Sequence, residues 1–461
     1  MGYIIFPVDL SVNTGLQRCH RSDTHKTCIG GVLEAKKKGR WAGLVTLAFG
    51  NTVDNADGGL INNLFPLIQE SLNLSLSYLG ILTSISRFSR MIFGPFWSMA
   101  GDRFSRKTLL VFVTGVWGIW TLLAGLAQTP AELLILYTLA SLGTVACEPL
   151  STSVLSDLFP PHERGRAFGL WRAITGVGMV VFIPIIGLFS QSSEGWRAAM
   201  VLLGSLSVLS GILILVFLRE PERGASDDTG PDEHRFSWSE LKDLASSPSL
   251  RWMALSLVLV TSLVMMSFAV TFLHDVRHFT TEKSNFILAF FAVGYVLSSV
   301  IGGMIGDWAE KKSPKYGRII LMQSYLAVYA IMSYLSLQVA WPPEFYYPLF
   351  FLFGLISSIG VTGAFYPMVT ELTLPELRTS AFGFLFATVQ GGVSALLSLA
   401  VGYFAQHLGL LPVVFWITTV PYGVNALLWF VLYRTYPRDI DQVAYERLAR
   451  QVIRTRKTGS A

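Results

Sequence analysis

The sequence predicts an all-α membrane protein in which twelve membrane-spanning helices form two six-helix bundles. Three observations support this fold class. Hydrophobic residues make up 52% of the chain and charged residues only 14%, whereas a water-soluble domain carries about a quarter charged residues. Long apolar runs recur along the 461 residues, and a helix needs roughly 20 such residues to cross a bilayer. A polar segment after the sixth run divides the chain into halves with equal numbers of runs.

The N-terminal tail, residues 1–40, precedes the first apolar run. It lacks the order of basic, apolar and small residues that marks a signal peptide, and it ends in a basic stretch at 36–40. We expect it to be a disordered cytoplasmic tail. The three cysteines of the chain show no paired spacing, so neither a disulfide framework nor a metal site is expected.

Glycine, proline and charge clusters separate the apolar runs that follow. The first bundle, 41–218, is expected to contain spans at 42–68, 78–100, 108–127, 132–157, 166–189 and 197–218. A polar linker is expected at 219–250. The second bundle, 251–434, is expected to contain spans at 251–273, 284–305, 318–339, 345–370, 379–406 and 411–433. A polar, basic tail at 435–461 ends the chain.

Two short sequences are repeated between the halves. The segment 101–107 after the second span is similar to 306–312 after the eighth, and 159–170 is similar to 374–384. The two repeats lie about 205 and about 214 residues apart, at matching positions. They predict two pseudo-symmetric halves related by an axis normal to the membrane, an arrangement found in secondary transporters.

Basic residues predict the orientation. They cluster in both tails and in the connections after even-numbered spans, whereas Arg197, Arg277 and Lys283 are the exceptions in the other connections. Basic loops stay in the cytoplasm. Both termini and the linker are therefore expected on the cytoplasmic side of a plasma (inner) membrane. The net charge of +5 is explained by topology, and no nucleic-acid partner is expected because exposed aromatics do not accompany the basic residues.

The segment 98–107, SMAGDRFSRK, resembles the loop between the second and third helices of the major facilitator superfamily, whose pattern is Gly-x-x-x-Asp-Arg-x-Gly-Arg-Lys. Ser98 and Ser105 replace glycines, and the charged residues are kept. The second copy keeps Asp307 but has Trp308 at the basic position. With the six-plus-six layout, the resemblance covers nearly the whole chain and implies the major facilitator fold and a monomeric transporter.

We expect the charged residues of these loops to act as a gate. Asp102 would cap a helix end, and Arg103 or Arg106 would bridge to a neighbouring helix in one of two conformations. Arg166 and Asp307 are placed in the same role by their positions in the repeats. The alternative is that the basic residues only fix the topology.

The first span is also similar to that of the spinster-type lipid transporters, in which an aspartate stands nine residues before a proline. Asp57 and Pro66 have this spacing, and the segments 195–197 and 219–221 are similar as well. This resemblance implies a lysophospholipid-like substrate.

Six ionisable residues lie inside predicted spans, all in the first half: Asp54, Asp57, Arg87, Arg90, Glu148 and Arg172. Each costs roughly 2.5–3.5 kcal/mol on insertion scales, and such groups normally face the bundle interior. At a rise of about 1.5 Å per residue, three pairs have matching depths. We therefore expect ion pairs that join Asp57 to Arg87, Asp54 to Arg90 and Glu148 to Arg172.

These charges suggest a division of roles. Asp54, Asp57 or Glu148 is expected to carry a proton, because a buried carboxyl beside a movable arginine can change its protonation with conformation. Arginine guanidinium groups bind anions through forked donors. Arg87, Arg90 and Arg172 are therefore expected to bind an anionic substrate group. Static buried ion pairs are the alternative.

The second half carries aromatic and polar candidates for the opposite wall of the binding site, namely Tyr295, Tyr325, Phe365, Tyr366 and Gln390. Such residues suit an amphipathic cavity, although ordinary packing between helices is the alternative.

The combined expectation is a proton-coupled transporter of an organic, anionic or amphipathic solute, with protons and membrane lipids as further partners and no cofactor. A multidrug/proton antiporter for hydrophobic or cationic compounds is the first alternative. A non-transporting receptor or scaffold is the second. No catalytic set of residues indicates an enzyme.

Overall fold

The computed structural model describes residues 25–221, 247–260, 262–373 and 381–458. Side chains are described from Gly39 to Tyr445 within these ranges, apart from Asp102, Pro161, His162, Ser262, Leu263 and Ala387. Every regular element in the described residues is a helix.

The first half contains α2 (His25–Leu72), α3 (Leu76–Arg103), α4 (Arg106–Leu110), η1 (Val111–Gly115), η2 (Val116–Gly118), α5 (Ile119–Ala124), α6 (Pro130–Thr144), α7 (Cys147–Leu158), α8 (Pro161–Leu188), η3 (Phe189–Gln191) and α9 (Gly195–Phe217). The second half contains α11 (Pro248–Val258), α12 (Ser262–Asp275), α13 (Thr281–Lys312), α14 (Gly317–Ser333), η4 (Tyr334–Gln338), η5 (Pro343–Phe345), α15 (Tyr346–Ile356), η6 (Val361–Phe365), α16 (Tyr366–Leu372), η8 (Gly383–Gln390), α18 (Gly391–Leu408), α19 (Leu410–Val414), η9 (Phe415–Thr419), α20 (Val420–Leu428), η10 (Trp429–Val431) and α21 (Leu432–Thr458).

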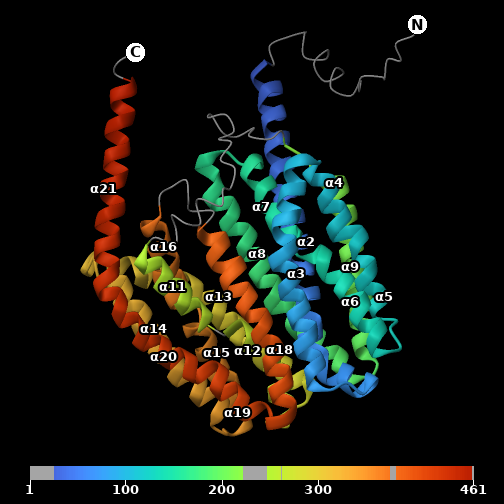
Figure 1. Ribbon diagram of the computed structural model, residues 1–461. Coiled ribbons are helices and arrows are strands. Elements are labelled where there is room, and N and C mark those ends of the chain that lie inside the picture. Colours follow the sequence, from blue (N-terminus) through green and yellow to red (C-terminus); the bar gives the residue numbers. More distant parts are fainter. Residues whose placement is uncertain (1–24, 222–246, 261, 374–380, 459–461) are drawn as a thin grey trace.

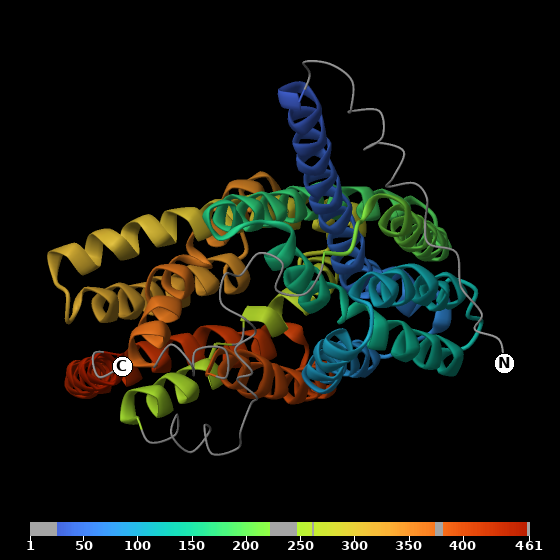
Figure 2. The same ribbon diagram turned by 90° about the horizontal axis from the view of Figure 1, so that it is seen from above.

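The helices of each half gather into one bundle, and the two bundles stand side by side (Figures 1 and 2). The start of α2 and the end of α21 project from the same end of the molecule. We call this the inner end and the opposite end the outer end. The prediction of an all-α fold made of two bundles is confirmed.

Hydropathy alone identifies only some of the spans. Among the described residues, nine helices are long and apolar enough to cross a membrane, and α2, α3 and the α11–α12 pair are not among them. α2 and α3 carry four of the six ionisable residues predicted to lie inside spans, while α11 and α12 are each short. The spans that fail this test are thus those that carry buried charge or are interrupted.

Two boundaries differ from the prediction. α2 begins at His25, so the last part of the supposedly disordered N-terminal tail is helical. α21 continues to Thr458, so most of the C-terminal tail is helical as well. Both segments are continuous with a spanning helix, α2 in spite of the pair Gly30-Gly31 and α21 in spite of Pro437.

Side-chain hydroxyl groups cap the starts of some of the helices, including α6 and α11. The Thr129 hydroxyl accepts a hydrogen bond from the Glu132 amide at the start of α6, where Pro130 is the first helical residue. The Ser247 hydroxyl caps α11 in the same way. Asp439 of α21 also accepts hydrogen bonds from the Ser247 hydroxyl and the Ser249 amide, both at 2.8 Å. This contact joins the first and last spans of the second bundle at the inner end.

The buried apolar residues form two clusters. The larger combines the core of the second bundle with the outer halves of the first-bundle helices, such as Leu64, Leu79 and Leu203. The smaller contains only first-bundle residues near the inner end, such as Leu47, Leu155 and Leu218. The two bundles therefore share an apolar core only through the outer half of the molecule.

The closest approach between the bundles is that of α3 and α18. A Cβ atom on Gly80 would lie 2.6 Å from the Ser398 carbonyl oxygen, and one on Gly402 would lie 2.8 Å from the Gly80 Cα. The Ser84 hydroxyl donates to the Ala395 carbonyl at 2.8 Å. All these contacts lie toward the outer end of α3, so the structure is closed at its outer end.

Candidate substrate and proton site

Three of the predicted charges meet on one face of the first bundle. Glu148 lies in the first turn of α7, where the negative charge is favoured by the helix dipole. Its Oε2 lies 3.6 Å from Arg90 Nη1 of α3, and its Oε1 lies 3.8 Å from Arg172 Nη2 of α8. The ion pair between Glu148 and Arg172 was expected, and the pairing with Arg90 was not. We call these residues the charged triad.

The charged triad is accessible to solvent and carries one excess positive charge. The exposed fractions of the side chains are 62% for Arg90, 41% for Glu148 and 71% for Arg172. Both ion-pair distances are longer than a hydrogen bond. The guanidinium groups therefore retain donors that an incoming anion can use.

Aromatic residues of the second bundle lie near the triad. The charges of Arg172 and Glu148 act on the hydroxyl of Tyr366, and Tyr295 is close to the same hydroxyl. Tyr366 is 40% exposed and Tyr295 46% exposed. These two predicted wall residues of the second bundle are thus partly exposed and within electrostatic range of the triad.

Tyr366 belongs to an aromatic group with Phe382 and Phe386. The ring centroid of Tyr366 lies 5.7 Å from that of Phe382 and 5.0 Å from that of Phe386. The rings of Phe382 and Phe386 stack, with their centroids 5.8 Å apart. A charged surface and an apolar aromatic surface are therefore adjacent.

Asp54 and Asp57 occupy a different environment from the triad. Both are buried in the first bundle. The Thr114 hydroxyl donates to Asp54 Oδ2 at 3.2 Å, and the Thr121 hydroxyl donates to Asp57 Oδ2 at 2.7 Å. The expected ion pairs of Asp57 with Arg87 and of Asp54 with Arg90 are absent from the described residues, because the aspartates face the third span. Matching depth is not enough to make a pair when two helices turn different faces to each other.

Arg87 lies at the boundary between the bundles and not in the triad. Its Nη2 donates to the hydroxyl of Ser267 in α12 at 2.8 Å. This is a hydrogen bond from the first bundle to the second. The substrate-binding role expected for Arg87 stays a prediction.

Two predicted wall residues are inside the second bundle. Tyr325 is buried, and its hydroxyl donates to the Ser357 carbonyl at 2.9 Å. Phe365 is fully buried against Phe386 and Trp429. In this conformation both are packed against neighbouring helices of the second bundle, and their expected role as wall residues stays a prediction. Gln390 is half-buried at the end of η8.

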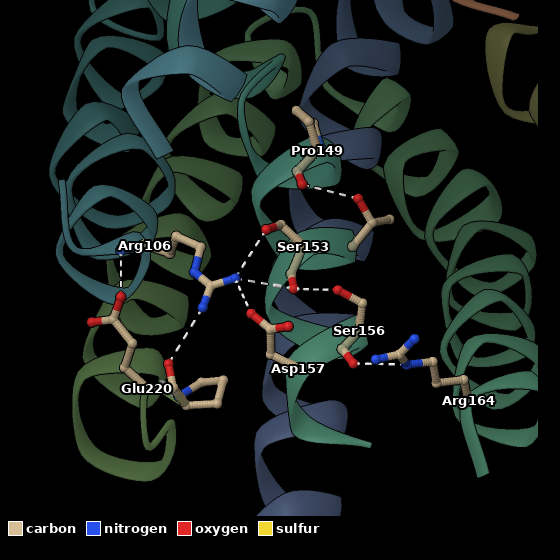
Figure 3. A network of polar contacts seen from close by, with 9 residues as sticks. Arg106, Pro149, Ser153, Ser156, Asp157, Arg164 and Glu220 are labelled. Atoms are coloured by element: carbon tan, nitrogen blue, oxygen red, sulfur yellow. Dashed lines mark hydrogen bonds and ion pairs between the residues drawn. The ribbon is translucent and has the colours of Figure 1, made fainter. Parts of the chain in front are cut away.

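Arg106 is the centre of a polar network at the inner end of the first bundle (Figure 3). Its Nη1 lies 2.6 Å from Asp157 Oδ2 and 3.0 Å from the Ser153 hydroxyl, both on α7. Its backbone amide donates to Glu220 Oε1 at 2.6 Å, and its Nη2 donates to the Pro221 carbonyl. Arg106 thus bridges to a neighbouring helix as expected, within one bundle.

The remaining predicted gate residues are less constrained. Arg103, Arg166 and Asp307 are exposed, and the side chain of Asp102 lies outside the described residues. Their roles as gate residues remain predictions.

The second bundle contains a network similar to that of Arg106, which the sequence analysis did not predict. Arg318 donates to Glu310 and lies 3.8 Å from Glu371, whose Oε2 accepts a hydrogen bond from the Tyr436 hydroxyl at 2.6 Å. Glu371 follows Asp157 by about 214 residues, the spacing of the sequence repeats. A comparison of charged residues about 214 positions apart in the sequence would therefore have identified Glu371 as the counterpart of Asp157.

Comparison with known proteins places these features in a family. The model of the Major Facilitator Superfamily matches residues 47–390 and 285–458. The probable sulfoacetate transporter of Cupriavidus necator is 23% identical over 392 residues, which cover 78% of this chain and 86% of that protein.

Spinster-type proteins are similar over a shorter region. Human protein spinster homolog 1 is 26% identical over 213 residues, and the sphingosine-1-phosphate transporter of Danio rerio is 27% identical over 208 residues. These alignments cover 45% and 44% of this chain, and 40% and 41% of those proteins.

A solved structure has the same fold. A bacterial homologue of the human lysosomal transporter Spinster, in an inward-facing and unoccupied conformation, superposes with a TM-score of 0.75. It is 20% identical, and the match covers 87% of this chain and 98% of that chain. The family model matches most of this chain, and the fold agrees with it. The protein therefore belongs to the Major Facilitator Superfamily, whose members are membrane transporters and not enzymes.

Proposed function

We propose that this protein is a proton-coupled secondary transporter for an organic anion, including amphipathic anions of the lysophospholipid type. The charged triad carries the proposal. Two arginines with exposed donors flank a single carboxylate, and paired guanidinium groups recognise carboxylate, sulfonate and phosphate groups through forked hydrogen bonds.

Competition for the arginines explains how a solute and a proton can be coupled. A bound anionic group takes Arg90 and Arg172 away from Glu148. A proton that moves with the anion would compensate the negative charge that the two arginines no longer neutralise. One anion and one proton are then bound together.

Asp54 and Asp57 are the second candidates for proton carriers. Each is buried with a threonine hydroxyl as its hydrogen-bond donor. An ionised carboxylate in such surroundings is costly unless it is compensated, so both are suited to exchange a proton when the bundles move.

The aromatic group of Tyr366, Phe382 and Phe386 supports an amphipathic solute, because it lies next to the triad. The names of two relatives agree with an anionic solute: one is a probable sulfoacetate transporter and the other a sphingosine-1-phosphate transporter. We also propose a monomer in the plasma (inner) membrane with both termini in the cytoplasm, as the distribution of basic residues suggests.

The test uses purified full-length protein in liposomes that contain a pH-sensitive dye. A panel of sulfonates, uronic acids, lysophospholipids and cationic drugs is added in turn. We expect anionic members of the panel to drive proton movement, and Glu148→Gln to abolish the coupling. Glu344→Gln, which changes an exposed outer-loop carboxylate, is the control and should behave like wild type.

Proton movement driven only by cationic drugs would favour the multidrug antiporter instead. If no solute moves protons, or if Asp57→Asn and Glu148→Gln both leave coupling unchanged, the proposed mechanism is wrong.

A further inference from the structure

Asn285 of α13 is a buried amide at the boundary between the two bundles. The residue has an exposed fraction of 0%. Its Nδ2 donates to the Asn63 carbonyl of α2 at 2.9 Å and to the Thr281 carbonyl of its own helix at 2.9 Å. A Cβ atom added at Gly187 of α8 would lie 2.7 Å from the Asn285 Cβ. Asn285 therefore lies directly against two helices of the first bundle.

The boundary between α8 and α13 narrows toward the outer end, where Asn285 lies. A Cβ atom added at Gly176 of α8 would lie 3.4 Å from Val296 of α13. Gly169 is about five helical turns from Gly187 and so lies on the same face of α8. A Cβ atom added there would meet nothing within 4 Å. Asn285 thus occupies the tight part of the boundary, which must separate when the outer end opens.

The donors of the Asn285 amide have partners, and its acceptor has none. An asparagine amide carries two N–H donors and one oxygen that accepts hydrogen bonds. Both groups that the nitrogen contacts are carbonyls, so the nitrogen and not the oxygen must face them. The oxygen, Oδ1, is buried and has no hydrogen-bond partner within the described part of the chain. In this conformation it has lost hydrogen bonds to water without replacement.

Closure of the outer end therefore costs more at this residue than it gains. The gain is the bond to the Asn63 carbonyl, which the helical pattern of α2 already pairs with the amide four residues on. A hydrogen bond that replaces one to water adds little, whereas an unsatisfied buried acceptor costs its full desolvation penalty. The bond to Thr281 lies within α13 and does not change when the bundles separate.

We propose that Asn285 is a positioning residue that favours opening of the outer end, because its Oδ1 regains hydrogen bonds when water reaches the boundary. A leucine of similar shape would hold the two bundles together more firmly. A transporter that alternates between two conformations must leave its closed end able to open, and Asn285 limits the stability of that closed end. This role does not require a particular solute or coupling ion.

The test measures outer-end opening from electron spin resonance distances between labels at Ser193→Cys and Glu344→Cys. These positions are exposed, one in each bundle, in connections at the outer end. The full-length protein, with its three native cysteines replaced, is placed in lipid nanodiscs. A folded variant gives the same two populations of distances as the starting protein, and the ratio of closed to open molecules is the readout.

We expect Asn285→Leu to raise the closed-to-open ratio about tenfold, which corresponds to about 1.4 kcal/mol, because it removes the unsatisfied oxygen. Asn285→Asp keeps the shape and the acceptors but loses the amide donors, so the ratio should fall about tenfold. Gly80→Leu forces α3 and α18 apart at the same end of the molecule. Added to Asn285→Leu, it should bring the ratio back toward that of the starting protein.

Asn425→Leu is the matched control. Asn425 of α20 is equally buried, and its Nδ2 donates to the Ser256 carbonyl of α11 at 3.0 Å. Its Oδ1 also lacks a partner among the described residues. Both helices belong to the second bundle. The same chemical change should therefore alter the thermal unfolding temperature and leave the closed-to-open ratio within about twofold of the starting value.

Three results would overturn the inference. If Asn285→Leu lowers the ratio, or Asn285→Asp raises it, the bond to Asn63 stabilises the closed state and the proposed direction is wrong. If Asn285→Leu leaves the ratio unchanged, the amide does not set this equilibrium. If Asn425→Leu raises the ratio equally, the effect does not belong to the boundary between the bundles.

Discussion

At the scale of single residues, arginine side chains in the spanning helices have different surroundings. Arg90 and Arg172 are exposed beside Glu148, whereas Arg106 is buried and makes hydrogen bonds to two segments of the chain. The first two retain donors for a solute, whereas the Nη1 and Nη2 donors of Arg106 are used within the protein. Substitutions at these arginines should therefore affect different properties.

We expect Arg172→Lys to weaken solute binding and leave stability unchanged. Lysine keeps the charge but loses the forked donors that hold an anion at two points. The loss should raise the KM for an anionic solute about tenfold, which corresponds to about 1.4 kcal/mol. Transport measured against solute concentration in liposomes tests this. Arg103→Lys, at an exposed loop position, should leave KM unchanged, and an unaltered KM in Arg172→Lys would contradict the assignment.

We expect Arg106→Ala to destabilise the fold. The substitution removes the guanidinium that lies 2.6 Å from the Asp157 carboxylate inside the protein, and removing one partner of a buried ion pair costs about 3–5 kcal/mol. A lower thermal unfolding temperature in detergent micelles is the measurement. Arg103→Ala serves as the control, because Arg103 is exposed. Equal unfolding temperatures for the two variants would show that the network contributes little.

At the scale of elements, the contact between α3 and α18 closes the outer end. The helices approach so closely at Gly80 and Gly402 that a side chain at either position would meet backbone atoms. Hydrogen bonds from Ser77 to Gln406 and from Ser84 to the Ala395 carbonyl lie beside this approach. Small residues thus allow the two bundles to approach closely at the outer end. The same two surfaces must separate if the outer end opens.

Gly80→Leu should shift the protein toward an outward-open state. The leucine cannot fit against the Ser398 carbonyl, so α3 and α18 separate at their outer ends. A cysteine at the buried position Ser84 should then react with a membrane-impermeant thiol reagent about tenfold faster, which corresponds to about 1.4 kcal/mol. Gly94→Leu on the same helix is the matched control, because a Cβ there meets nothing within 4 Å. Unchanged reactivity in Gly80→Leu would exclude this contact as a determinant of closure.

At the scale of the whole molecule, each bundle contains a similar network of ion pairs centred on an arginine. Arg106 and Asp157 in the first bundle correspond to Arg318 and Glu371 in the second. Each set joins helices of a single bundle at the inner end. Each bundle is therefore stabilised by contacts between its own helices. Such contacts are needed if each bundle moves as a rigid body.

The two networks should contribute independently to stability. Arg106→Ala and Glu371→Gln change different bundles, so their effects on the free energy of unfolding should add within about 0.5 kcal/mol in the double variant. Chemical unfolding of the single and double variants in micelles provides the comparison. A larger interaction energy would mean that the networks are coupled across the bundle boundary.

The fold class, the approximate spans and the identity of the intramembrane charges could all be predicted from the amino-acid sequence. These depend on composition and on local patterns, since a bilayer requires apolar helices of a given length. The spacing of the sequence repeats also predicts the position of Glu371 from that of Asp157. The sequence did not reveal that α2 extends to His25, because the helical preference of a basic segment depends on the helix that it continues.

Only the tertiary structure decided which charges meet. Depth along a helix can be counted from the sequence, but the direction of a side chain depends on how each helix is rotated against its neighbours. Asp57 therefore meets Thr121 and not Arg87, while Glu148 lies between Arg90 and Arg172. For the same reason Tyr366 lies near the charged triad and Tyr325 is buried in the second bundle. The six charges that the sequence predicts inside spans belong to the first half. The candidate site forms where that half meets the aromatic residues of the second.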